Sequence, residues 1–143
     1  MRFVLDASVT LSWLLQDGSA KDGLYALGVL NALRAGDARS SVPVTWGLEV
    51  ANVLARGEAK AQITEAQSEA FLEMLRGLAI ETDAASADKS LLDTLQLARR
   101  FNLSGYDASY LELALRSGCA LATLDAGLRR ATEKAGVKSF RPA

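Results

Sequence analysis

The sequence contains no histidine, and this absence excludes several kinds of active site. Serine and cysteine hydrolases of the triad type need an imidazole as general base, and histidine is a frequent ligand of catalytic zinc. Cleavage of RNA by a pair of imidazoles acting as acid and base is excluded as well. If the protein is a hydrolase, its carboxylates must carry out the chemistry.

Cysteine and long apolar stretches are also scarce. Cys119 is the only cysteine, which excludes an internal disulfide and a zinc site built from cysteines. Its setting between Gly118 and Ala120 predicts a small buried side chain. Four polar residues interrupt the most apolar stretch, residues 3–15, so no membrane span is expected. The N-terminus does not have the order of a signal peptide, and we expect a cytoplasmic protein that does not associate with membranes.

The length and the charge set further bounds. Half of the 143 residues are hydrophobic, which predicts one domain over residues 1–143. The net charge is −1, but residues 99–143 contain eight lysines and arginines against four acids. This excess is consistent with ordinary solvated helix faces or with a basic rim that contacts a polyanion.

Short apolar runs alternate with segments of helical periodicity along the whole chain. We expect strands at residues 1–5, 40–43, 78–82, 120–124 and 137–140. Helices are expected at 9–15, 24–33, 45–57, 86–100, 105–115 and 126–135, and another that begins at a capping box of Thr64 and Gln67. This alternation predicts an α/β fold with a doubly wound parallel sheet covered on both faces.

Four carboxylates each end a short apolar run: Asp6, Glu49, Asp107 and Asp125. Parallel sheets bind ligands beyond the carboxyl ends of their strands, and Asp6 and Asp125 both stand at such an end. Like charges gathered in one pocket repel and need neutralisation. Oxygen ligands favour Mg²⁺ or Mn²⁺, and a pair of such ions is a common device for breaking phosphodiester bonds.

Each acid also has a simpler structural explanation. Asp6 and Asp125 precede helical segments and are suitable N-caps, while Asp107 near a helix start complements the helix dipole. Glu49 is harder to explain in this way, because its apolar neighbours indicate burial and a buried glutamate needs a partner.

Nearby polar residues are candidates for supporting roles. The hydroxyls of Ser8 and Thr123 are close in sequence to Asp6 and Asp125, and they either orient a carboxylate or a metal-bound water or serve as an ordinary cap and strand residue. Asn52 shares a helix face with Glu49 and either holds it or is surface polar. Four aromatic residues are expected in the core or an interface rather than as stacking platforms: Trp13, Trp46, Tyr106 and Tyr110.

Five sequence blocks together resemble the PIN-domain ribonucleases, and more narrowly the VapC toxins of toxin–antitoxin pairs. They lie in register at residues 4–8, 49–54, 103–114, 121–125 and 135–137. The resemblance implies a PIN-like three-layer α/β/α sandwich with a short, mainly parallel central sheet. It also implies that Asp6, Glu49, Asp107 and Asp125 bind Mg²⁺ or Mn²⁺, with Ser8 and Thr123 in support.

One departure from the family pattern concerns the residues after the last aspartate. Many PIN domains have a further acidic or amide residue there, whereas this chain has Ala126, Gly127 and Leu128. A site with one metal ion and a site with two therefore both remain open.

The resemblance implies a metal-dependent endoribonuclease in which water attacks phosphorus and leaves a 5′-phosphate and a 3′-hydroxyl. Glu49 or Asp107 is the expected acceptor of the water's proton. Arg129 and Arg130, one turn after Asp125, are candidates for contacting the RNA backbone, although solvated surface explains them equally well.

The resemblance also implies a cognate VapB-type antitoxin that lies along an apolar groove, and we expect a homodimer. The candidate anchors on the first helix are Leu11, Trp13, Leu14 and Leu15. The same residues would serve equally in a dimer interface or in the core.

Two other functions fit parts of the pattern. A phosphatase-like domain that is phosphorylated on a strand-end aspartate is one, but Ser8 stands where such a domain has its second acid. An inactive PIN scaffold that binds RNA or a protein is the other, and the four intact acids argue against it.

Overall fold

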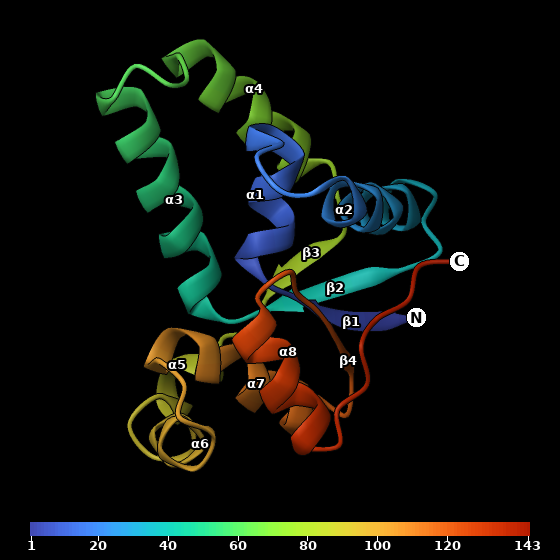
Figure 1. The fold of residues 1–143 in the computed structure, drawn as a ribbon, viewed down its shortest axis with the longest axis vertical. Coiled ribbons are helices and arrows are strands. Elements are labelled where there is room, and N and C mark those ends of the chain that lie inside the picture. The colour runs from blue at the N-terminus through green and yellow to red at the C-terminus, as the bar shows by residue number, and fades with distance from the viewer.

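Four short strands form one parallel sheet at the centre of the computed structural model, which describes all 143 residues (Figure 1). The strands are β1 (Arg2–Leu5), β2 (Arg39–Val42), β3 (Ile80–Thr82) and β4 (Ala120–Ala122). Their order is β3-β2-β1-β4, and every neighbouring pair is parallel. The chain therefore runs outward from β1 in both directions, which confirms the predicted α/β class and the parallel sheet.

Eight helices surround this sheet: α1 (Ala7–Leu15), α2 (Ala20–Arg34), α3 (Val44–Ala59), α4 (Glu65–Arg76), α5 (Ser86–Lys89), α6 (Asp93–Phe101), α7 (Gly105–Ser117) and α8 (Ala126–Lys134). Side chains alternate between the two sheet faces. Phe3 and Leu5 accordingly pack with α2, whereas Val4 packs with α7 and α8. Layers of helix, sheet and helix result, as expected for the sandwich.

Helices α3 and α4 extend away from the sheet and are joined at the end far from it (Figure 1). Their apolar sides enclose a third cluster, in which Val50, Leu54 and Phe71 pack near α1. The predicted capping box begins α4: Thr64 accepts from the Gln67 amide at 3.1 Å, and the Gln67 side chain accepts from the Thr64 amide at 2.8 Å. No helix of the structure has the length and apolar character needed to cross a membrane.

The prediction of one helix over residues 86–100 is wrong, because the chain breaks into α5 and α6. The Ser86 hydroxyl donates to the carbonyl oxygen of Asp83 at 2.7 Å and accepts from the amide of Val44 at 2.9 Å, which ties α5 to the start of α3. Helix α6 instead packs along α7. One straight helix cannot satisfy both contacts, and the exposed Leu91 and Leu92 lie at the break.

The predicted strand at residues 137–140 is also wrong. Only Ser139 forms an isolated bridge, with Leu121. Two backbone hydrogen bonds join the segment to Leu121 of β4, and Phe140 stacks on Phe3 with 3.9 Å between ring centroids, so the pairing is too short to form a strand. Cys119, predicted to be buried, is half-exposed at the end of α7.

Candidate active site

Asp6 follows β1 directly and is almost fully buried, with 4% of its surface exposed. It occupies the N-cap position of α1, but its side chain makes no capping hydrogen bond. Its Oδ2 atom instead accepts hydrogen bonds from the hydroxyls of Ser8 at 2.6 Å and Thr123 at 2.8 Å. The capping explanation therefore does not account for the Asp6 side chain, and Oδ1 is not occupied by either hydroxyl.

The same two hydroxyls organise the loop between β4 and α8. Ser8 Oγ accepts from the amide of Leu124, and Thr123 Oγ1 accepts from the amide of Asp125, both at 3.0 Å. Ser8 and Thr123 thus fix both the orientation of Asp6 and the path of the chain that leads to Asp125. Orientation of a carboxylate was one of the two roles considered for these residues.

Asp125 and Asp107 stand at the starts of α8 and α7. Asp125 is the N-cap of α8, and its Oδ2 accepts from the amide of Leu128 at 2.7 Å, so the capping explanation holds for that oxygen. Asp107 is not a cap, because Ser104 caps α7 by accepting from the Asp107 amide at 3.0 Å. Asp125 is exposed and Asp107 half-buried.

Glu49 projects from α3 and finds a partner that the sequence analysis assigned to the core. The hydroxyl of Tyr110, a residue with no exposed surface, donates to Glu49 Oε1 at 2.7 Å. Tyr110 is one helical turn after Asp107, so α7 places this donor on the same helix face as Asp107. Asn52 lies one turn beyond Glu49 but makes no hydrogen bond to it.

The structure brings all four acids to one cavity of about 290 Å³ at the carboxyl ends of β1 and β4. The lining residues are Asp6, Ala7, Ser8, Leu11, Glu49, Asn52, Val53, Asp107 and Asp125. Thr123 does not line the cavity itself but donates a hydrogen bond to Asp6. The sequence analysis did not identify the apolar wall that Leu11 and Val53 provide.

The cavity concentrates negative charge without a protein cation. All six ion pairs of the structure involve other acids. Burial raises the pKa of Asp6 and of Glu49, and neighbouring carboxylates raise both further. Burial, followed by repulsion from Asp6 and Asp125, raises the pKa of Asp107 to about 6.

A divalent cation fits this donor set. Carboxylate oxygens are the ligands that Mg²⁺ and Mn²⁺ prefer, and the uncompensated charge supplies the attraction. No three of these side chains are already gathered at metal-ligand spacing in the structure. The acids line the cavity and would have to close around an ion.

The two arginines after Asp125 differ in their surroundings. Arg129 is half-buried and donates to the carbonyl oxygen of Thr123 at 2.8 Å, so it braces the loop that carries Asp125. Arg130 is exposed. Contact of either residue with RNA stays a prediction.

The expected antitoxin anchors on α1 are only partly accessible. Leu11, Trp13, Leu14 and Leu15 are all half-buried, and the first three pack against the cluster between α3 and α4. The Trp13 indole also donates to the carbonyl oxygen of Ala26 at 2.7 Å. The fold itself therefore uses much of this surface.

Comparison with known proteins agrees with the fold. The PIN domain family matches residues 3–134. Ribonuclease VapC9 of Mycobacterium tuberculosis is 33% identical over 122 residues, which are 85% of this chain and 84% of that protein. The chain therefore belongs to the PIN-domain family and, within it, groups with the VapC ribonucleases.

Solved structures share the fold at lower identity. PAE2754 from Pyrobaculum aerophilum superposes with a TM-score of 0.66 and 20% identity, over 97% of this chain and 83% of that chain. VapBC2 from Rickettsia felis, solved bound to a DNA fragment from its promoter, gives a TM-score of 0.65 and 12% identity over 98% of each chain.

Proposed function

We propose that this protein is a metal-dependent endoribonuclease and the toxin of a toxin–antitoxin pair. The observation that carries the proposal is the cavity of four carboxylates without a protein cation. The relatives that match at 33% identity are named ribonucleases, which supports RNA as the substrate. The expected compartment is the cytoplasm, where RNA is found.

Asp6, Glu49, Asp107 and Asp125 would hold one or two Mg²⁺ or Mn²⁺ ions. When bound, such an ion makes water a stronger nucleophile and offsets the charge that develops on the phosphate. Asp6 is held by the hydroxyls of Ser8 and Thr123, which both bond to Oδ2 and leave Oδ1 available to an ion.

The remaining acids supply the proton chemistry. Glu49 or Asp107 accepts the proton of the attacking water, and Tyr110 holds Glu49 in place for this by its hydrogen bond. Asn52 contributes an amide at the cavity wall. Because water attacks rather than a ribose hydroxyl, the products are a 5′-phosphate and a 3′-hydroxyl.

Cleavage of end-labelled RNA by the purified protein tests the proposal. We expect cutting with Mg²⁺ or Mn²⁺, none with EDTA, and loss in the variants Asp6→Asn and Asp107→Asn. A matched control is Asp22→Asn, because Asp22 stands three residues after the cap of α2 as Asp107 does in α7. Cutting that persists in EDTA or in both site variants would contradict the proposal.

We further propose a VapB-type antitoxin and a homodimer as the partners of the chain. Structural neighbours described as VapBC and FitAB complexes support the antitoxin. Coexpression with the product of the adjacent gene should abolish RNA cleavage and yield a complex on gel filtration. Light scattering of the free protein should give twice the mass of one chain, and a monomeric mass would contradict the dimer.

A further inference from the structure

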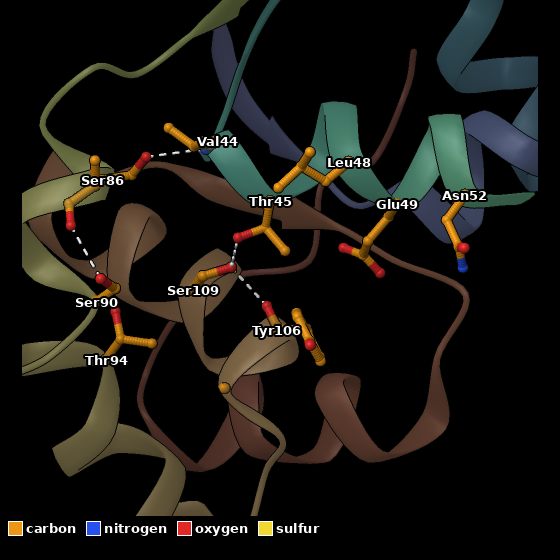
Figure 2. A pocket seen from close by; sticks show the side chains of 12 residues that line it. Val44, Thr45, Leu48, Glu49, Asn52, Ser86, Ser90, Thr94, Tyr106 and Ser109 are labelled. Carbon is orange, nitrogen blue, oxygen red and sulfur yellow. Dashed lines mark hydrogen bonds between the residues drawn. The ribbon is translucent and has the colours of Figure 1, made fainter.

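A second, larger cavity of about 860 Å³ adjoins the acidic one (Figure 2). Glu49 and Asn52 line both cavities, so the two spaces meet along α3. Its other walls come from α5, α6 and the start of α7. The volume is within the range of small-molecule sites, and the position is beside the proposed point of cleavage.

Tyr106 lines the larger cavity as an exposed aromatic ring on a fixed backbone. Its relative exposure is 67%, so of the two expected positions, core or interface, the core is excluded. Its carbonyl oxygen accepts from the Ser109 hydroxyl at 2.6 Å, and the same hydroxyl lies 3.0 Å from that of Thr45 on α3. In Figure 2 the Tyr106 side chain rises from α7 toward Glu49, which projects from α3.

Thr94 provides an unused polar group inside the cavity. It is 4% exposed, lines the wall, and its hydroxyl makes no hydrogen bond to the protein. By contrast, the hydroxyls of Ser86 and Ser90 are both bonded to backbone atoms, at 2.7 Å to Asp83 and 2.9 Å to Ala87. The Thr94 hydroxyl is therefore available to a ligand in the cavity.

The lining determines the chemistry of the occupant. No lysine or arginine contributes to it, so it has nothing to pair with a phosphate. Most of its surface is apolar, and hydroxyl, amide and carboxylate groups are placed along it, so the occupant needs both apolar faces and polar edges. An uncharged flat group with donors and acceptors on its edge fits the exposed ring, the Thr94 hydroxyl and the Asn52 amide.

We propose that this cavity binds one unpaired nucleoside of the RNA substrate, next to the phosphate that is cut. The base stacks on Tyr106 and hydrogen-bonds to Thr94 and Asn52. Single-stranded RNA is commonly recognised through splayed bases that stack on aromatic side chains. The inference rests on the proposed ribonuclease function, but the nucleoside pocket can be tested without cleavage.

Titration with free nucleosides, followed by backbone amide NMR in EDTA, is the first test. We expect saturable shifts at residues 94 and 106 with at least one of the four nucleosides. The variant Tyr106→Ala should weaken this binding by about tenfold or more, whereas Tyr106→Phe keeps the ring and the affinity. Thr94→Val should also weaken nucleoside binding while it keeps the shape of the side chain. The control is Leu24→Ala, because Leu24 is an exposed residue of α2 outside the cavity. Absence of shifts at these residues with all four nucleosides would overturn the proposal.

Cleavage of oligonucleotides with an abasic site on either side of the cut is the second test. One abasic position should lower kcat/KM of the wild type by about tenfold or more, and should have no further effect in Tyr106→Ala. Equal losses in wild type and variant at every position would overturn the placement of the base on Tyr106. If neither protein cuts RNA but nucleosides still bind, the ribonuclease function fails and the nucleoside pocket stands.

Discussion

Removal of the charge of Asp107 should stabilise the metal-free protein while it abolishes cleavage. The repulsion between Asp107, Asp6 and Asp125 is present in the folded state only, and it contributes to raising the pKa of Asp107 to about 6 from 3.8. An amide in place of the carboxylate avoids both the burial of a charge and this repulsion. We therefore expect Asp107→Asn to have a larger free energy of unfolding in EDTA.

The magnitude follows from the shift. A change of about two pKa units corresponds to roughly 3 kcal/mol. Asp107 is only half-buried, so solvent screening reduces the expected gain to about 1–2 kcal/mol, or a rise in Tm of about 3–6 °C.

The raised pKa of Asp107 determines how the stability gain of Asp107→Asn changes with pH. A carboxyl whose pKa is raised in the folded state binds more protons folded than unfolded, so its contribution to stability is lost as the pH rises through the folded pKa. The advantage of Asp107→Asn should therefore be complete at about pH 8, roughly half as large at about pH 5, and almost absent at about pH 4. Urea unfolding followed by circular dichroism at these three pH values measures it.

Asp22→Asn is the matched control, since Asp22 holds the same position after the serine cap of α2 but lies outside the acidic cavity. It should lose up to about 1 kcal/mol of favourable interaction with the helix dipole rather than gain stability. The reasoning is refuted if Asp107→Asn is no more stable than the wild type at about pH 8, or if its gain in the free energy of unfolding does not change with pH.

Three further outcomes are expected. Mg²⁺ at about 100 times its Kd should raise the free energy of unfolding of the wild type by about 2.7 kcal/mol, and much less in Asp6→Asn, as measured by thermal unfolding. Thr123→Val removes the donor to Asp6 and the acceptor of a backbone amide, and should cost about 1–3 kcal/mol together with most of the cleavage rate. Tyr110→Phe leaves Glu49 without its donor, and should lower kcat while the far-UV spectrum stays unchanged. An unchanged rate in either of the last two variants would contradict the positioning roles.

The pattern of apolar runs predicted most of the fold because strand and helix periods differ clearly in this chain. The four strands and the acids at the ends of β1 and β4 follow from that pattern. The break at Leu91 and Leu92 does not, because the leucines continue a helical period and only the tertiary contacts of Ser86 and α6 interrupt it. Phe140 shows the same limit, since its stacking on Phe3 is a long-range contact.

The four acids of the candidate site could be predicted from the sequence, but the contacts of the residues around them could not. Each acid taken alone is also explained by a cap or a helix dipole, and Asp125 does cap α8, so the signal lies in four acids that each end an apolar run. The bond between Tyr110 and Glu49 joins α7 to α3, and no local pattern in the sequence relates those two helices. Thr94 is similar: a threonine within a helix gives no sign that it will line a cavity formed with other helices.

The two halves of the acidic cavity differ in how firmly they are held. Asp6 and Glu49 are each fixed by side-chain hydroxyls, from Ser8, Thr123 and Tyr110. Asp107 and Asp125 are anchored mainly through the helix starts that carry them, and both are more exposed than Asp6. Asp6 and Glu49 are therefore the more firmly held half of the candidate site.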